Sequence, residues 1–136
     1  MTIIDQLKRD EGYNPKPYRD SLGKLTIGYG TLIEDGLDQE ECEWLLQHRY
    51  QIRAKNPVAQ YIPWSNSLDD ARLGVLENMA YNLGIFGLLS FKNMLSMIQS
   101  GDYKGASVHL LDSKYAMQVG ARAHRLAVQL ETGVWQ

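Results

Sequence analysis

The apolar positions at the start of the chain predict one short helix. They recur at helical spacing on a single face: Ile3, Ile4 and Leu7. Thr2 followed three residues later by Asp5 has the pattern of a capping box, and Gly12 ends the helix. Glu11 therefore lies in the last helical turn, where the negative end of the helix dipole disfavours an ionised carboxylate.

A period of two replaces the helical period in the next segment. Leu25, Ile27 and Tyr29 alternate with small or polar residues, which is typical of a strand, and a turn signal at 21–24 precedes them. We interpret residues 17–33 as a hairpin. Asp20 comes at the end of its first arm and Thr26 lies on the second.

Helical periodicity returns after Gly36. Asp38 caps a helix expected to reach about Arg53, and residues 56–67, which contain two prolines, are expected to form a connection. Ser67 is predicted to start a long helix that ends at Gly84. Its apolar stripe is the expected core: Leu68, Val75, Leu76, Met79, Ala80 and Leu83. Three shorter amphipathic helices follow at 90–100, 102–111 and 121–130.

These elements predict an α+β, mainly helical fold in a single domain spanning residues 1–136. A small hairpin lobe would comprise residues 13–55, and a larger helical lobe would comprise residues 1–12 and 56–136. A cleft between two such lobes is a natural site for a polymer.

Composition excludes several classes of protein. With 136 residues, 44% hydrophobic and 22% charged, the chain is expected to fold as one soluble domain without a membrane span or secretory signal. A net charge of −2 argues against nucleic-acid binding. Six acids fall within 34–43, where they suit the start of a helix, so the rest of the chain is mildly basic and compatible with an anionic polymer.

The cysteine and the histidines give no sign of a metal site. Cys42 has no disulfide partner and is expected to be a half-buried helix thiol. His48, His109 and His124 lack metal-ligand spacing. We therefore expect no metal and no cofactor.

Three polar residues near the hairpin form the candidate catalytic group: Glu11, Asp20 and Thr26. Glycosidic cleavage needs one carboxyl group that arrives protonated and a second that stays charged. The helix end and partial burial would favour protonation of Glu11, Asp20 beside a polar turn would stay ionised, and the Thr26 hydroxyl could hold water. Spacing alone favours the alternative that these are ordinary solvated residues.

Longer motifs closely resemble the phage-type lysozymes, the endolysins of tailed bacteriophages. Around the candidate group they are Arg9-Asp10-Glu11-Gly12, Tyr18-Arg19-Asp20, Gly23 and Thr26-Ile27-Gly28-Tyr29-Gly30. Further matches in the family's order are Asn78-Met79, Phe91, Tyr103, Ala106, Ser113, Tyr115, Gln118, Arg122, Arg125 and Thr132-Gly133-Val134-Trp135. The resemblance covers nearly the whole chain and is weakest in the middle.

The resemblance implies roles for the matching residues. Glu11 would be the general acid, and Asp20 and Thr26 would position the water that attacks the anomeric carbon. Family members of this type generally invert that centre, which requires the two carboxyl groups to lie about 6.5 to 9.5 Å apart.

The resemblance also implies supporting residues. Arg122 would pair with Glu11, and Arg125 with Asp10, although both arginines could serve only to tie the last helix to the first. Leu32 and Tyr81 match cleft-lining positions, or could be core. The stretch 30–38 is much shorter than in the longest relatives, which reduces the substrate-facing wall of the hairpin lobe.

The expected substrate is bacterial peptidoglycan, cut at the β-1,4 bond between N-acetylmuramic acid and N-acetylglucosamine. The resemblance implies a role in host lysis: the protein would be a monomer that stays in the host cytoplasm until a separately encoded holin opens the membrane, and would then act on the wall in the periplasm. Two alternatives remain open. One is a catalytically silent wall-binding module, and the other is the same muramidase used as an interbacterial toxin or phage-tail component.

Overall fold

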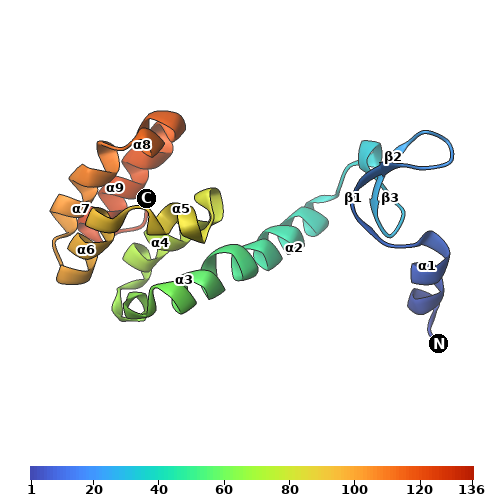
Figure 1. Ribbon diagram of the computed structural model, residues 1–136, viewed down its shortest axis with the longest axis horizontal. Coiled ribbons are helices and arrows are strands. Elements are labelled where there is room, and N and C mark those ends of the chain that lie inside the picture. Colours follow the sequence, from blue (N-terminus) through green and yellow to red (C-terminus); the bar gives the residue numbers. More distant parts are fainter. The chain divides into compact units, whose positions relative to one another are not determined.

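The computed structural model describes residues 1–136 and confirms the expected α+β, mainly helical class (Figure 1). The chain divides into two compact units, Met1–Trp44 and Leu45–Gln136, with the boundary inside helix α2. The predicted assignment of residues to two lobes, with 1–12 in the helical lobe, stays a prediction. No helix has the length and apolar character needed to cross a membrane.

The first unit contains α1 (Ile3–Glu11) and a small antiparallel sheet. The capping box of α1 is confirmed, because the Asp5 N–H donates to Thr2 Oγ1 at 3.1 Å and the Thr2 N–H donates to Asp5 Oδ2 at 2.8 Å. Gly12 ends the helix as predicted. The apolar face of α1, formed by Ile3, Ile4 and Leu7, is exposed.

The sheet has three strands in the order β1-β2-β3, one more than the predicted hairpin needs. They are β1 (Asn14–Arg19), β2 (Leu25–Gly28) and β3 (Thr31–Leu32). The register between β1 and β2 shifts between Asn14 and Tyr18, a segment that contains Pro15 and Pro17. Proline has no N–H to donate, so ladder pairing cannot be regular there.

A long run of helix follows the sheet. Asp38 caps it as predicted, since the Glu41 N–H donates to Asp38 Oδ1 at 2.8 Å. The run consists of α2 (Gln39–Tyr50), a π-helical turn (Gln51–Lys55) and α3 (Asn56–Tyr61).

Two predictions for this region are wrong. Residues 56–67 are not an irregular connection but α3 and a 3-10 turn, Pro63–Ser67, because Pro57 and Pro63 occupy first-turn positions where no N–H is needed. Cys42 is exposed rather than half-buried.

The second unit is a helical body that carries the apolar core. Its long helix α4 (Asp70–Leu83) begins three residues after the predicted Ser67, because Asp69 is the residue that caps it, by accepting from the Arg72 N–H at 3.1 Å. Gly84 ends α4 as predicted. The other helices are α5 (Ile85–Leu89), α6 (Lys92–Ser100), α7 (Tyr103–Leu111), α8 (Lys114–Val119) and α9 (Ala121–Thr132).

The core lies where these helices pack on one another. Helix α7 packs against α6 and α9, and α4 packs against α5 and α9, as Figure 1 shows in green to red. Four residues of the predicted stripe are completely buried: Val75, Leu76, Met79 and Ala80. Leu68 is only half-buried, since it ends the 3-10 turn instead of starting the helix.

Candidate active site

Glu11 is the last residue of α1, and its carboxylate lies against the backbone at Gly30. Gly30 has φ +75°, and a Cβ built there would collide with Glu11 Oε2 and lie 2.8 Å from Glu11 Cδ. Any larger residue would push the carboxylate away from the β2–β3 turn. Glu11 is exposed, so the partial burial expected from the sequence is wrong.

Asp20 follows directly after β1, and the turn fixes its carboxylate. Asp20 Oδ1 accepts hydrogen bonds from the N–H groups of Leu22 at 2.9 Å and Lys24 at 2.8 Å. The other oxygen, Oδ2, makes no hydrogen bond within the protein. One carboxylate oxygen is therefore held by the backbone and the other is open to an external donor.

Thr26 lies on β2 and is the only buried residue of the first unit, at 2% exposure. Its hydroxyl donates to the Lys24 carbonyl oxygen at 3.0 Å. Because the hydroxyl proton is used in that bond, Oγ1 can still accept a hydrogen from a partner such as water.

The main chain of Lys24 connects Asp20 to Thr26. Its N–H donates to the Asp20 side chain, while its carbonyl accepts from both the Thr26 hydroxyl and the Asp20 N–H, the latter at 2.9 Å. Sequence reasoning missed this role, since it belongs to the backbone and leaves no mark on the residue type.

Leu32 lies directly opposite Thr26 in the register of β2 and β3. Directly opposed residues of an antiparallel pair point to the same face of the sheet. Leu32 is half-buried. It therefore shares a face with Thr26, as a residue lining the same site would.

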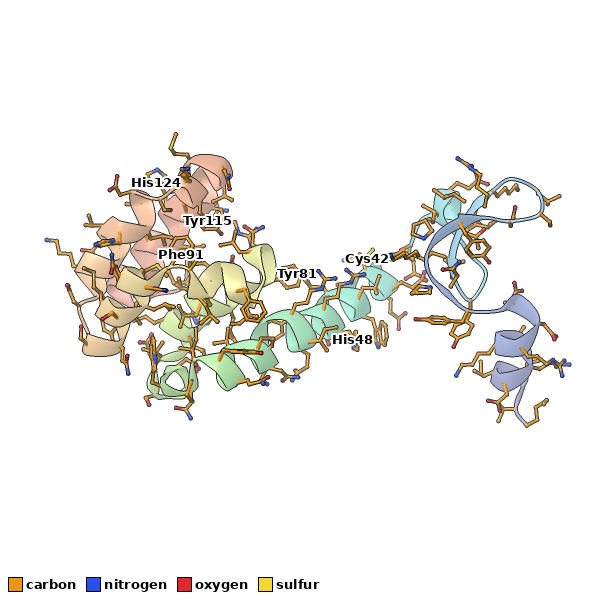
Figure 2. The ribbon with its side chains drawn as sticks, in the orientation of Figure 1. Cys42, His48, Tyr81, Phe91, Tyr115 and His124 are labelled. Atoms are coloured by element: carbon orange, nitrogen blue, oxygen red, sulfur yellow. The ribbon has the colours of Figure 1, made fainter.

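The other predicted site residues, Tyr81 and Arg122, belong to the second unit and line one cavity there. The cavity has a volume of about 560 Å³, and Asn78 contributes to its wall. Arg122 donates to Asn78 Oδ1 from Nε at 3.0 Å and from Nη2 at 2.7 Å. Figure 2 labels Tyr81 on α4. Asn78 appears among the family motifs, but its contact with Arg122 was not predicted.

Two expected ion pairs, Glu11 with Arg122 and Asp10 with Arg125, would join residues of different units, and they stay predictions. Within its own unit, Asp10 accepts from Arg9 Nε at 2.9 Å.

Tyr50 and Glu77 form a second polar contact in the same cavity wall. The Tyr50 hydroxyl donates to Glu77 Oε2 at 2.9 Å. Partial burial, and then the hydrogen bond to Glu77 and its negative charge, raise the pKa of Tyr50 to about 12. The phenol therefore stays protonated at any physiological pH.

A buried tyrosine lies elsewhere in the helical unit. Tyr115 on α8 meets Phe91 edge to face, with ring centroids 6.1 Å apart, and both are labelled in Figure 2. Burial raises the pKa of Tyr115, and the positive charge of Arg122 opposes the rise. The structure contains no group of three or more His, Cys, Asp or Glu side chains arranged to hold a metal ion.

Comparison with known proteins bears on the candidate catalytic residues. The family model for phage lysozyme matches residues 8–127, which include Glu11, Asp20 and Thr26. The chain belongs to the phage lysozyme family. It is accordingly assigned to the glycoside hydrolases, in agreement with the predicted family.

Individual relatives of this phage lysozyme family member come from different settings. The chain is 27% identical to probable T4-type lysozyme 2 of Dictyostelium discoideum, over 97% of this chain and 95% of that protein. It is 32% identical to the SAR-endolysin of bacteriophage PS119, over 78% of this chain and 64% of that protein. It is also 27% identical to the pre-baseplate central spike protein Gp5 of Enterobacteria phage T4, of which it covers 28%.

Proposed function

We propose that the protein is an endolysin that hydrolyses the β-1,4 bond between N-acetylmuramic acid and N-acetylglucosamine in peptidoglycan. Glu11 is the general acid that protonates the leaving oxygen. Asp20 is the base that takes a proton from water, and Thr26 orients that water. The supporting observation is that the Lys24 main chain joins Asp20 and Thr26 in a family-matched motif.

The hydrogen bonds of this pair account for how water is oriented. Asp20 Oδ2 and Thr26 Oγ1 are both available as acceptors, because Oδ1 and the hydroxyl proton are already bonded to Lys24. A water that donates one hydrogen to each acceptor keeps a lone pair free for the anomeric carbon. Attack by water on the face opposite the leaving group inverts that centre, with the carboxyl groups about 6.5 to 9.5 Å apart.

Replacing Glu11 tests the assignment of the acid. Glu11→Gln should abolish release of reducing ends from purified cell walls, because the amide cannot donate the proton. Its circular-dichroism spectrum and melting temperature should match those of the parent, since Glu11 is exposed. Glu40→Gln is the matched control, an exposed glutamate of the same unit, and should retain full activity. Lysis by Glu11→Gln at the parent rate would refute the role of Glu11.

Product analysis tests the reaction itself. Hydrolysis with inversion of a β bond gives reducing muramic ends that are first formed as the α-anomer, which NMR detects. Anhydro-muramic ends in the mass spectrum would instead identify a lytic transglycosylase, which uses one acid and no water.

The relatives support one biological setting in particular. Endolysins among them favour action on the cell wall after release. We propose that the protein is a monomer that waits in the host cytoplasm for a separately encoded holin and then reaches the periplasm. The spike protein favours a second candidate, the same muramidase as a phage-tail component. A neighbouring holin gene would support lysis, whereas neighbouring tail genes would support the second candidate and an immunity gene would indicate a toxin.

A catalytically silent wall-binding module is the remaining alternative. It would be supported by retention on insoluble peptidoglycan without release of reducing ends. The presence of Glu11, Asp20 and Thr26 together argues against it, because a silent module has no need of all three.

Leu32 and Tyr81 are proposed as substrate contacts and Arg122 as a supporting residue.

A further inference from the structure

We propose that the helical unit carries a second carbohydrate site, which holds one N-acetylhexosamine ring of the glycan strand. The site is a cavity of about 280 Å³ between the 3-10 turn Pro63–Ser67 and the junction of α6 with α7. It shares no residue with the cavity that Tyr81 and Arg122 line. The inference rests on the proposed function only in taking peptidoglycan as the polymer.

Two half-buried aromatic residues, Trp64 and Tyr103, form walls of this cavity and pack against the core. Trp and Tyr combine an apolar ring with one polar N–H or O–H group. They therefore suit partners that have an apolar face and a polar edge. Tyr103 is held firmly, since the Arg72 guanidinium stacks 3.7 Å from its ring centroid. Tyr103 lines the cavity and Arg72 does not.

The polar groups around the cavity are free to bind a ligand. The indole N–H of Trp64 and the side-chain amide of Gln99 make no hydrogen bond within the protein. The Ser100 hydroxyl donates to the Met97 carbonyl at 3.0 Å and therefore retains acceptor capacity. The Ser67 hydroxyl donates to Asn66 Oδ1 at 3.4 Å and likewise retains acceptor capacity. These donors and acceptors suit the hydroxyl and acetamido groups of an amino sugar.

The charge and the volume of the cavity restrict the class of ligand that it can bind. No charged side chain lines the cavity, which disfavours a phosphate, a carboxylate or a metal ion. Its volume of about 280 Å³ lies just below the roughly 300–1,000 Å³ range of pockets for drug-sized ligands. A single neutral sugar ring fits those limits, and N-acetylglucosamine is the neutral sugar of peptidoglycan.

A titration followed by ¹H–¹⁵N NMR tests the site in the full chain carrying Glu11→Gln, so that no substrate is cut. The probes are N-acetylglucosamine and its β-1,4-linked trimer, with glycerol at equal concentration as a control. We expect saturable shifts of the Trp64 indole N–H, the Gln99 side-chain amide and the backbone N–H of Gly101. No shift at these groups, or equal shifts with glycerol, would overturn the proposal.

Variants separate binding from folding. Gln99→Ala should weaken sugar affinity on the order of five- to ten-fold, because it deletes an exposed polar partner without disturbing the core. Trp64→Leu should remove the saturable shifts while the remaining spectrum stays folded. Gln60→Ala, an exposed glutamine on α3 outside this cavity, should bind as the parent does. Parent-like affinity in Gln99→Ala and Trp64→Leu together would refute the site.

The outcome is independent of the proposed catalysis. If Glu11→Gln still lyses cell walls while the sugar titration behaves as expected, the acid assignment fails and the second site stands. If Glu11→Gln is inactive and the titration shows no saturable shift, the assignment of Glu11 stands and the second sugar site is refuted.

Discussion

At the scale of single residues, the absence of a side chain at position 30 decides where the Glu11 carboxylate lies. The Gly-x-Gly pattern is visible in the sequence, and the resemblance predicted Glu11, Asp20 and Thr26. The sequence could not reveal that Gly30 makes room for Glu11, because the two strands β1 and β2 separate these residues along the chain. The expected half-buried state of Cys42 was wrong for a related reason, since a helical pattern does not say which face finds a neighbour.

A pair of glycine substitutions tests that contact. Gly30→Ala should reduce cell-wall hydrolysis at least about a hundred-fold, since displacing a catalytic group by about 1 Å can cost that much. Gly28→Ala is the control, because Gly28 also has a positive φ, +69°, but a Cβ there would meet nothing within 4 Å. Both variants carry similar backbone strain. Equal activity in the two variants would contradict the proposed role of Gly30.

At the scale of elements, helix caps were predictable and proline-containing segments were not. Asp38 caps its helix as predicted, by accepting from the backbone N–H group three residues later, and Asp102, predicted as the first residue of a helix, does the same for α7. Residues 56–67 were misinterpreted because Pro57 is compatible with both a helix start and a break. The short helices α5 and α8 were not predicted, since five or six residues display too little of a helical period.

Arg72 connects three helices and should be sensitive to a conservative change. Its Nε and Nη2 donate to the carbonyl oxygens of Leu130 at 2.7 Å and Glu131 at 2.8 Å, near the end of α9, and its guanidinium stacks on Tyr103 of α7. Lysine cannot reproduce this geometry. Arg72→Lys should lower the free energy of unfolding in urea by about 2 kcal/mol. Arg53→Lys is the control, because Arg53 is exposed and its side chain makes no hydrogen bond. This variant should leave the free energy of unfolding unchanged.

The contact between α2 and α4 should make stability depend on alkaline pH. The pKa of Tyr50 is raised from 10.0 to about 12, so the folded state holds this proton more tightly than the unfolded state does. The resulting stabilisation is present below pH 10 and is lost as pH rises through about 12. The melting temperature of the parent should therefore fall relative to that of Tyr50→Phe across this range. A constant difference between the two proteins from pH 9 to pH 12 would contradict the prediction.

At the scale of the whole molecule, apolar burial is unevenly distributed between the two units. Every buried apolar residue lies between Ala54 and Leu130, whereas Thr26 is the only buried residue of Met1–Trp44. The long helical stripe predicted this concentration in the helical part. The sequence did not predict that the small unit lacks an apolar core, because its alternating residues resemble those of any half-buried strand.

Separate fragments should behave differently as a result. Residues 45–136 should fold alone and melt cooperatively by circular dichroism, because they contain the entire apolar core. Residues 1–44 should be largely unfolded in isolation, since so short a chain without a core cannot offset its conformational entropy. A cooperative transition in the 1–44 fragment would show that the sheet and α1 are sufficient on their own.

The involvement of the Lys24 main chain has a consequence for how this protein can vary through evolution. Because only its peptide N–H and carbonyl hold Asp20 and Thr26, nearly any amino acid can replace the lysine without loosening either group. Proline is the exception, since it would delete the donor to Asp20. Selection at this position would consequently appear as the exclusion of one residue type, and a search for invariant side chains would pass over it.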